Sequence, residues 1–478
     1  MQQQEDDKKI VKRGFGRKPS RSEIIKCLLF CTLAILFTIW VGDFWPLIFV
    51  VLIVDVYWMK FIPWSWWKKI KNNALRSIMS WVDAIVFALV AVYFLQNFFF
   101  QNFQIPTTSL EKTMLAGDYL LVSKYHYGPR IPMTPLSFPL YQHTITLPWS
   151  DTPLGKSYIE QPQVPYRRMP GLRDIERYDI VVFNYPAGDT VATKHQNDDY
   201  YRLKFHYGVN ALHNDKATFG DIVYRPVDRR ENYVKRCVGL PGDSLQIIDN
   251  KLYIDGRQLE DPQYLQQNYF IHTKRPIQER TWRGLGVYSN DVQEIGSAPH
   301  IYGALGIEPT GVTDRLYLAP LTQEMVEKLH KMTAVADIVV YPAGFGGKDY
   351  VYPLSENNTW TSANYGPIWI PQAGKSIQLT AENVALYERC IVNYEGNTIQ
   401  MNSDSTFLLN GKPATEYTFE MNYFWMMGDN RHNSADSRYW GFVPEDHIVG
   451  TPLFIWFSKD PETGAMRWDR VFKKVKGI

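Results

Sequence analysis

Metal-binding patterns, strong net charge and internal repeats are absent from this chain of 478 residues. Its four cysteines show no spacing typical of a zinc site. Its ten histidines are scattered and include no His–Glu–x–x–His sequence, which argues against a metalloprotease. A net charge of +2 gives no reason to expect a nucleic-acid partner. We therefore expect no metal, no other cofactor and no nucleic acid.

The scarcity of cysteine also limits disulfide bonding. Cys27 and Cys31 lie in an apolar run and are expected to act as small hydrophobic side chains. Cys237 and Cys390 lie far apart in the remainder of the chain. A disulfide between these two residues and a pair of free thiols are both compatible with the sequence.

The chain is too long for one ordinary hydrophobic core, so we expect two or three folded units. Tyr, Phe and Trp are abundant and together make up 15% of the residues. This composition is typical of β-rich domains and of the aromatic belts at membrane interfaces.

Three apolar stretches lie near the N-terminus, at about 24–41, 46–62 and 82–100. A helix needs roughly 20 apolar residues to cross a bilayer. The third stretch has this length and predicts a transmembrane helix over residues 81–100. The first two stretches are short and tightly linked, so residues 23–62 are predicted to form a hairpin of two transmembrane helices. An interfacial second stretch is the alternative.

Two details of the hairpin affect how it inserts. The first stretch has no small-residue cleavage site and is followed at once by more apolar sequence, which favours an anchor over a cleavable leader. The second stretch contains Asp55. Since a carboxylate is costly in lipid, we expect Asp55 to face a neighbouring helix.

Basic residues alternate with the apolar stretches and set the expected orientation. Those before or at the start of the first stretch are Lys8, Lys9, Lys12, Arg13, Arg17, Lys18, Arg21 and Lys26. Those between the second and third stretches or at their edges are Lys60, Lys68, Lys69, Lys71 and Arg76. The positive-inside rule then predicts a cytoplasmic basic tail over residues 1–22 and a cytoplasmic basic loop over residues 63–80. Everything beyond about residue 100 is expected outside.

The exported part has short β-type runs bounded by Gly, Pro, Asn and Asp. The runs are Tyr119–Ser123, Asp179–Asn184, Tyr233–Gly239, Ser244–Ile248 and Lys251–Ile254. Asp255–Gly256 after the last run is a strong hairpin signal, and the Pro-rich segment Pro129–Arg173 is predicted to be a loop. Helices are expected at Leu321–Met332 and Ala381–Val392. The exported part is therefore predicted to be mainly β.

A first polar motif follows the third apolar stretch. The run Ile105–Pro106–Thr107–Thr108–Ser109–Leu110 precedes a short amphipathic stretch and a β-type run. This arrangement can present Ser109 at a turn. On its own, a run of hydroxyl residues is more often an ordinary turn or helix cap.

A second motif is the run Tyr233–Val234–Lys235–Arg236–Cys237–Val238–Gly239. Strand alternation places Tyr233, Lys235 and Cys237 on one face. If Lys235 is buried, its pKa falls and its neutral amine becomes a general base. The alternative is a lysine that extends into water from an edge strand.

A third motif runs from Gly428 to Pro444 and is dense in hydroxyls, carboxylates and guanidiniums. Such density suits a hydrogen-bonded shell that holds a reactive site. The alternative is an Asx-rich loop with surface ion pairs, each worth about 0–1 kcal/mol.

Together the three motifs resemble those of bacterial type I signal peptidases, a family of membrane proteases with a Ser–Lys pair. Arg177–Phe183 resembles the family's strand motif between the first two. The resemblance covers about residues 81–125, 173–186, 231–256 and 421–458. It implies a catalytic domain of coiled antiparallel sheets, with parts at 101–250 and 421–478 and an inserted α+β or β cap domain at 251–420.

The resemblance also implies roles for individual residues. Ser109 corresponds to the nucleophile and Lys235 to the general base. Supporting roles fall on Thr107 for the oxyanion hole, Ser434 for orienting the lysine, and the expected pairs Asp429–Arg236 and Asp436–Arg438. The shallow pockets for small substrate residues correspond to Phe103, Ile105, Met114 and Val234.

Departures from the family pattern remove no chemical group that the reaction needs. Leu110 stands where Met is usual, Lys112 where Pro is common, and His432 at a place often held by Asp. Long segments at Ala187–Arg230 and Asn250–Glu420 exceed the family minimum, and the sequence indicates no role for them beyond capping.

The resemblance implies a serine endopeptidase that cleaves signal peptides from exported preproteins at the outer face of the bacterial cytoplasmic membrane. Its partners would be signal peptides and the bilayer, with a secretion translocon as a further candidate. Two other readings remain: a Ser–Lys protease for another envelope protein, and an inactive envelope scaffold.

Overall fold

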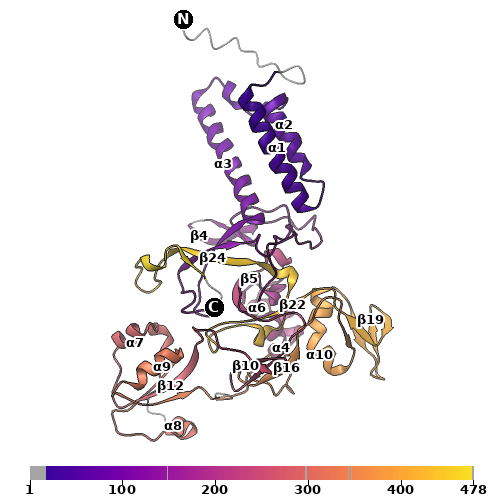
Figure 1. Ribbon diagram of the computed structural model, residues 1–478. Helices are drawn as coiled ribbons and strands as arrows, with labels where there is room; N and C mark the ends of the chain where they lie inside the picture. The colour runs from indigo at the N-terminus through magenta and orange to yellow at the C-terminus, as the bar shows by residue number, and fades with distance from the viewer. Residues whose placement is uncertain (1–17, 148, 297–298, 343, 346, 476–478) are drawn as a thin grey trace.

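The computed structural model describes residues 18–147, 149–296, 299–342, 344–345 and 347–475. Most of the basic tail expected over residues 1–22 lies outside these residues. Figure 1 shows three N-terminal helices side by side at one end of the molecule, with the β-rich part at their foot. The fold is mixed: apolar helices, one large curled antiparallel sheet and several small sheets.

The N-terminal helices differ from the expected three membrane spans. They are α1 (Arg21–Val41), α2 (Leu47–Val54) with its π-helical continuation η2 (Asp55–Met59), and α3 (Asn73–Phe98). Among the described residues, two helices, α1 and α3, have the length and apolar character to cross a bilayer. The apolar helix over Leu47–Met59 is shorter than a span usually requires, so the second span stays a prediction.

Sequence-local capping sets the ends of these helices. Ser20 and Glu23 form a capping box at the start of α1, and Gly42 ends that helix with a φ of 68°. The Asn72 side chain caps α3, which therefore begins at Asn73, well inside the basic loop expected over residues 63–80. This earlier start lengthens α3 at its N-terminal end, where the basic residues lie.

Asp55 is buried but does not rely on a neighbouring helix. Its carboxylate accepts hydrogen bonds from the backbone N–H groups of Phe61 and Ile62 and from the Trp64 indole. The turn after the helix thus satisfies the carboxylate locally.

The large sheet carries the three motifs. Its strand order is β1-β2-β24-β5-β8-β22-β23, with β25 paired to β24, and its pairs are antiparallel. The strands are β1 (Phe100–Gln104), β2 (Asp118–Ser123), β5 (Ile180–Asn184), β8 (Asn232–Gly239), β22 (Tyr423–Met427), β23 (Val443–Pro444), β24 (Ile448–Ser458) and β25 (Lys473–Lys474). Register shifts along β24 mark bulges, which increase local twist and help the sheet to curl.

Most of the expected local structure forms, with one clear exception. Asp255–Gly256 joins β10 (Lys251–Ile254) to β11 (Arg257–Gln258) with positive φ at both turn residues. The segment Pro129–Arg173, expected to be a loop, contains the hairpin β3 (Thr144–Leu147) and β4 (Ser150–Lys156). Two register shifts in this hairpin explain why the sequence lacks a regular alternation.

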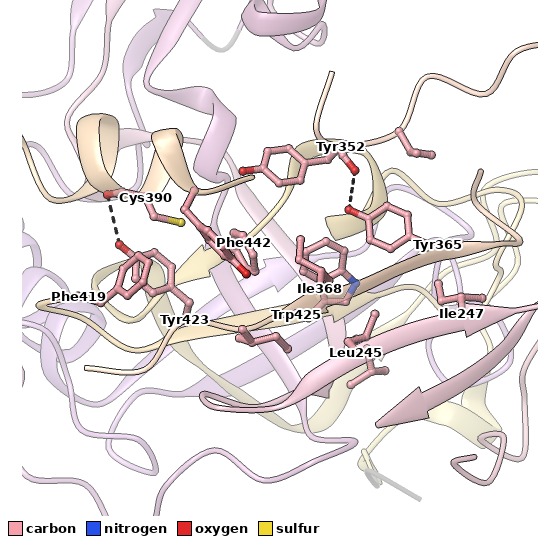
Figure 2. Close-up of a cluster of buried hydrophobic side chains, with 14 of the residues drawn as sticks. Leu245, Ile247, Tyr352, Tyr365, Ile368, Cys390, Phe419, Tyr423, Trp425 and Phe442 are labelled. Atoms are coloured by element: carbon pink, nitrogen blue, oxygen red, sulfur yellow. Dashed lines mark hydrogen bonds between the residues drawn. The ribbon is translucent and has the colours of Figure 1, made fainter. Parts of the chain in front are cut away.

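A second sheet, ordered β11-β10-β9-β16, packs on the large one. Its other strands are β9 (Ser244–Ile248) and β16 (Tyr365–Trp369). Figure 2 shows their shared core, in which Leu245, Ile247, Tyr365 and Ile368 lie beside Trp425 of β22. The β9–β10 hairpin crosses the expected boundary between residues 250 and 251, so the start of the expected cap packs with the motif-bearing part.

A further sheet, ordered β13-β14-β12-β15, forms a separate α+β lobe with its own apolar cores. Its elements are β12 (Gln267–Thr273), α7 (Glu279–Leu285), β13 (Gln293–Glu294), α8 (Pro299–Leu305), β14 (Arg315–Leu321), α9 (Gln323–His330) and β15 (Val335–Val340). Helix α9 confirms the helix expected at 321–332, trimmed at both ends. We call residues 267–340 the inserted lobe.

Small elements complete the fold. The segment after β5 contains β6 (Thr190–Ala192), α4 (Tyr200–Tyr207), α5 (Val209–Asn214), α6 (Lys216–Phe219) and β7 (Ile222–Tyr224). After β16 come β17 (Ser376–Gln378), α10 (Ala381–Arg389), β18 (Ile399–Met401), β19 (Phe407–Leu409), β20 (Lys412–Ala414), β21 (Glu416–Thr418) and, past β22, α11 (Ser437–Trp440). Cys237 and Cys390 are both buried as free thiols, which excludes the disulfide alternative in this structure.

Candidate active site

Ser109 lies in a turn after β1, where backbone contacts hold it. Its carbonyl accepts a hydrogen bond from the N–H of Asn430, 3.1 Å away, and the Asn433 side chain donates to the Thr108 hydroxyl. The first and third motifs are therefore joined directly at this turn. The Ser109 side chain is almost completely shielded, with 6% of its residue surface exposed.

Lys235 projects from β8 toward this turn. Its Nζ donates a hydrogen bond to Ser109 Oγ at 2.7 Å, and 5% of the residue surface is exposed. The nitrogen also lies 5.7 Å from the centre of the Tyr233 ring, as expected for neighbours on one strand face. The alternative of a solvated lysine on an edge strand is wrong, because β8 is paired on both sides.

The surroundings of Lys235 make it a usable base. Burial lowers the pKa of its ammonium to about 8, and Arg438 acts in the same direction, whereas Asp436 and Asp429 oppose the change. A substantial fraction of the amine is thus neutral near pH 8. A neutral amine in hydrogen-bond contact with a serine hydroxyl can accept its proton.

Both expected ion pairs form beneath the site. Arg236 contacts both carboxylate oxygens of Asp429 at 2.7 Å, and Arg438 contacts those of Asp436 at 2.9 and 2.8 Å. All four residues are buried. Thr113, next to the serine turn, donates to Asp429 as well, so the pair also anchors the segment after Ser109.

Thr107 and Ser434 differ in how well they fit their expected positions. The Thr107 hydroxyl lies 3.4 Å from Ser109 Oγ, within hydrogen-bond distance. In the described part of the chain Ser434 Oγ makes no hydrogen bond to Lys235, and its hydroxyl instead helps to lower the pKa of the Asp436 carboxyl. Ser434 is buried and packs against Gly428, which keeps it beside the site without orienting the lysine.

The four expected pocket residues share one apolar cluster beneath the serine turn. Ile105 and Met114 are buried in it, with 3% and 0% of their surfaces exposed. Phe103 and Val234 are partly exposed and pack on its edge. Only the latter two therefore offer surface to a ligand, and the buried pair supports them from below.

Gly428 is a site residue that motif reasoning missed as an individual requirement. A Cβ at this position would lie 2.3 Å from Ser434 Oγ and 2.7 Å from the Ser109 carbonyl oxygen. Nothing larger than glycine fits between the two serines. Its only sequence signal was its place at the start of the third motif.

The inserted lobe also reaches the site, which the sequence did not indicate. Gln266, just before β12, bridges to the third motif: its N–H donates to the Asp429 carbonyl at 2.8 Å, and its carbonyl accepts from Arg431 N–H at 2.9 Å. Lys112 follows the serine turn and contacts both Glu111 and the Gly286 carbonyl. Lys112 thus joins the lobe to the serine turn, and Gln266 joins the start of the lobe to the third motif.

No group of three or more His, Cys, Asp or Glu side chains is placed to hold a metal ion in the described ranges. The sequence pattern of a family described as "Signal peptidase, peptidase S26" matches residues 78–284 and 372–457, more than half of the chain. The chain belongs to this family. The match contains Ser109, Lys235 and the whole third motif, so the resemblance seen in the sequence is confirmed.

Named relatives of this signal peptidase family member cover most of its length. Signal peptidase I of Buchnera aphidicola subsp. Acyrthosiphon pisum is 22% identical over 393 residues, 82% of this chain and 78% of that protein. Signal peptidase I of Haemophilus influenzae is 22% identical over 419 residues, 86% and 79% of the two chains. That of Helicobacter pylori J99 is 22% identical over 423 residues, 84% and 95%.

The family match omits residues 285–371. Strands β13, β14 and β15 fall in this gap, so most of the inserted lobe lies outside what the signal peptidase pattern describes. The lobe contacts the serine turn all the same, because its Gly286 accepts from Lys112, and Gln266 joins the start of the lobe to the third motif; Lys112 and Gln266 both lie inside the match.

Proposed function

We propose that the protein is an active signal peptidase I, a membrane-bound serine endopeptidase that removes signal peptides from exported preproteins. The observation that carries the proposal is the 2.7 Å hydrogen bond between Lys235 Nζ and Ser109 Oγ in a buried setting. Family membership supports the same chemistry.

Lys235 takes the Ser109 proton as the hydroxyl oxygen attacks the scissile carbonyl. The Ser109 N–H and the Thr107 hydroxyl would hold the oxyanion, and such donors are each worth roughly 2.7–4 kcal/mol in known enzymes. The Lys235 ammonium then protonates the leaving amine, and an acyl-enzyme on Ser109 is hydrolysed by water. A Ser–Lys pair is an accepted variant of the triad.

The substrate class follows from the place of the site. Helix α3 ends at Phe98, and β1 leads directly from it to the serine turn. About ten residues extend at most roughly 33–36 Å, so Ser109 lies close to the membrane surface. A signal peptide presents its cleavage site just beyond its apolar stretch, at this depth.

The orientation supports a site outside the cytoplasm. Lys68, Lys69 and Lys71 precede α3, whereas its other end leads into β1 and carries no basic residue in its last turn. The positive-inside rule then favours the Lys68 side as cytoplasmic and the β-rich part as external, at the bacterial cytoplasmic membrane. The substrates would be preproteins delivered through the membrane.

The test is cleavage of a preprotein by the purified full chain in detergent. Ser109→Ala and Lys235→Ala should each abolish cleavage while circular dichroism shows an unchanged fold. Lys251→Ala is a matched control, because Lys251 pairs with Asp261 at the surface. Full activity of either dyad variant would refute the mechanism.

Mapping the cut sites separates the two protease readings. Small residues at the first and third positions before each cut support signal peptide cleavage. Cuts in mature envelope proteins, without small residues at those positions, would instead assign the Ser–Lys chemistry to another substrate.

A further inference from the structure

A polar cavity of about 420 Å³ lies where α3 meets the large sheet. Tyr93 and Asn97 from the last turns of α3 line it, together with Asn102 of β1 and the loop over residues 137–142. The Tyr93 hydroxyl donates to the Pro135 carbonyl at 2.7 Å and fastens that loop to the helix. The cavity is thus built between a membrane-length helix and the β-rich part.

The charges around this cavity are unbalanced. Lys124, Arg130 and Arg229 line it, and Asp228 is the only acidic residue among the described residues that do so. Arg130 donates to the Asn184 amide oxygen at 2.7 Å, a neutral acceptor. Arg229 bonds to neutral oxygens of Thr134 and Ser137 and approaches Asp228 only to 3.8 Å. Positive charge therefore exceeds negative charge in a shielded space.

Lys124 is the least satisfied of these groups. Its ammonium makes no hydrogen bond or ion pair with any described residue. Burial lowers the pKa of Lys124 to about 7, and Arg130, Arg229 and Arg168 add to this, while Asp228 opposes it. A bound anion would relieve the repulsion and supply the missing acceptor.

Asp228 indicates that a ligand in this cavity must also carry a hydrogen-bond donor. Its Oδ2 accepts from the N–H and hydroxyl of Thr134, at 2.9 and 3.0 Å. Its Oδ1 is buried and has no partner among the described residues. A ligand that carries both an anion and a hydroxyl would satisfy Lys124 and Asp228 together.

The rim of the cavity is apolar. Phe138 and Leu140, on the lining loop, are 43% and 68% exposed. Exposed apolar side chains beside a polar pocket mark contact with another phase or partner. Figure 1 shows the β4 region of the same segment at the foot of α3. In the proposed topology this rim faces the outer leaflet.

We propose that this cavity binds the headgroup of an anionic phospholipid of the phosphatidylglycerol type. Lys124 and Arg229 would contact the phosphate, and Asp228 would accept from a headgroup hydroxyl. The acyl chains would extend out of the cavity and pack on Phe138 and Leu140. The membrane setting rests on the proposed function. The cavity uses neither Ser109 nor Lys235, although the expected substrate-pocket residue Phe103 also lines it.

The experiment measures lipid retained by the full chain. The protein is placed in nanodiscs of phosphatidylcholine with a minor share of phosphatidylglycerol, and native mass spectrometry counts the lipids that stay bound. The wild type should retain phosphatidylglycerol in preference to phosphatidylcholine. Lys124→Gln should lower that retention about tenfold, and Lys124→Arg should restore it. Lys251→Gln, at the surface, is the control and should retain lipid as the wild type does.

Equal retention of phosphatidylglycerol by wild type and Lys124→Gln, with both folded by circular dichroism, would overturn the proposal. So would equal retention of the two lipids. Inorganic phosphate and glycerol phosphate are also tested on the detergent-solubilised protein. If either one stabilises the protein against unfolding as strongly as phosphatidylglycerol does, the site belongs to a soluble anion instead. The assay is repeated with Ser109→Ala, which should still retain phosphatidylglycerol although it cleaves no preprotein. The lipid proposal can therefore fail or hold independently of the protease proposal.

Discussion

Lys235 Nζ lies 2.7 Å from Ser109 Oγ although three strands separate β8 from β1 in the hydrogen-bonded order of the large sheet. The contact is therefore made across the curl of the sheet, not between adjacent strands. Strands β2, β24 and β5 form the back of this curl, and β24 comes from the far end of the chain. The pair depends on the whole sheet.

The rate of cleavage should rise with pH through about 8. Burial holds the pKa of Lys235 near that value, below its usual 10.5, and the amine is a base only when it has lost its proton. Below the pKa, kcat/KM should fall about tenfold for each pH unit. Initial rates on a peptide substrate over a pH series check this, and a flat profile through neutral pH would contradict it.

Replacing Gly428 by Ala should reduce activity much more than stability. The new Cβ would meet the Ser109 carbonyl at 2.7 Å, so the serine turn must shift by several tenths of an ångström. Misplacement of about 1 Å can cost roughly a hundredfold in rate. Kinetics and thermal unfolding of Gly428→Ala, beside the control Gly284→Ala where a Cβ meets nothing, test the point. Unchanged kcat would show that the turn tolerates movement.

Asp429→Ala should destabilise the fold by about 3–5 kcal/mol, because it leaves the Arg236 guanidinium buried without its carboxylate. The comparison is Asp221→Ala, which removes a surface pair with Lys216 and should cost at most about 1 kcal/mol. Denaturant unfolding in detergent measures both. Similar losses for the two variants would mean that the buried pair is not structural.

Lys112→Gly should loosen the inserted lobe from the serine turn. Lys112 has a φ of 71°, which glycine adopts freely, so this change removes the side chain without adding backbone strain. Loss of its contacts with Glu111 and Gly286 should cost about 1–3 kcal/mol. The pKa of the buried Glu111, already raised by burial, should rise further because Lys112 lowers it.

Limited proteolysis checks this prediction. Cleavage near α7 should accelerate in Lys112→Gly and stay at the wild-type rate in Lys331→Gly, a substitution elsewhere in the lobe. Equal rates for the wild type and Lys112→Gly would show that the other contacts of the lobe, such as Asn268–His432 and Tyr288–Arg467, hold it without Lys112.

Local sequence accounted for the features that depend on neighbours in the chain. The strands at 244–248 and 251–254 and the Asp255–Gly256 turn form as predicted, because alternation and turn chemistry act over a few residues. The Asp436–Arg438 pair was implied by the family resemblance, and it forms. The hairpin within Pro129–Arg173 was missed because its bulges remove the alternation.

By itself the sequence determined the family motifs, the apolar helices and which residue types the site contains. Only the tertiary structure decided that Lys235 is buried against Ser109, that Ser434 makes no bond to it, and that Gln266 bonds to the backbone of the third motif. The reason is physical: hydrophobic periodicity and turn preferences act over a few residues, whereas burial, pKa and contact distance depend on how distant strands curl together.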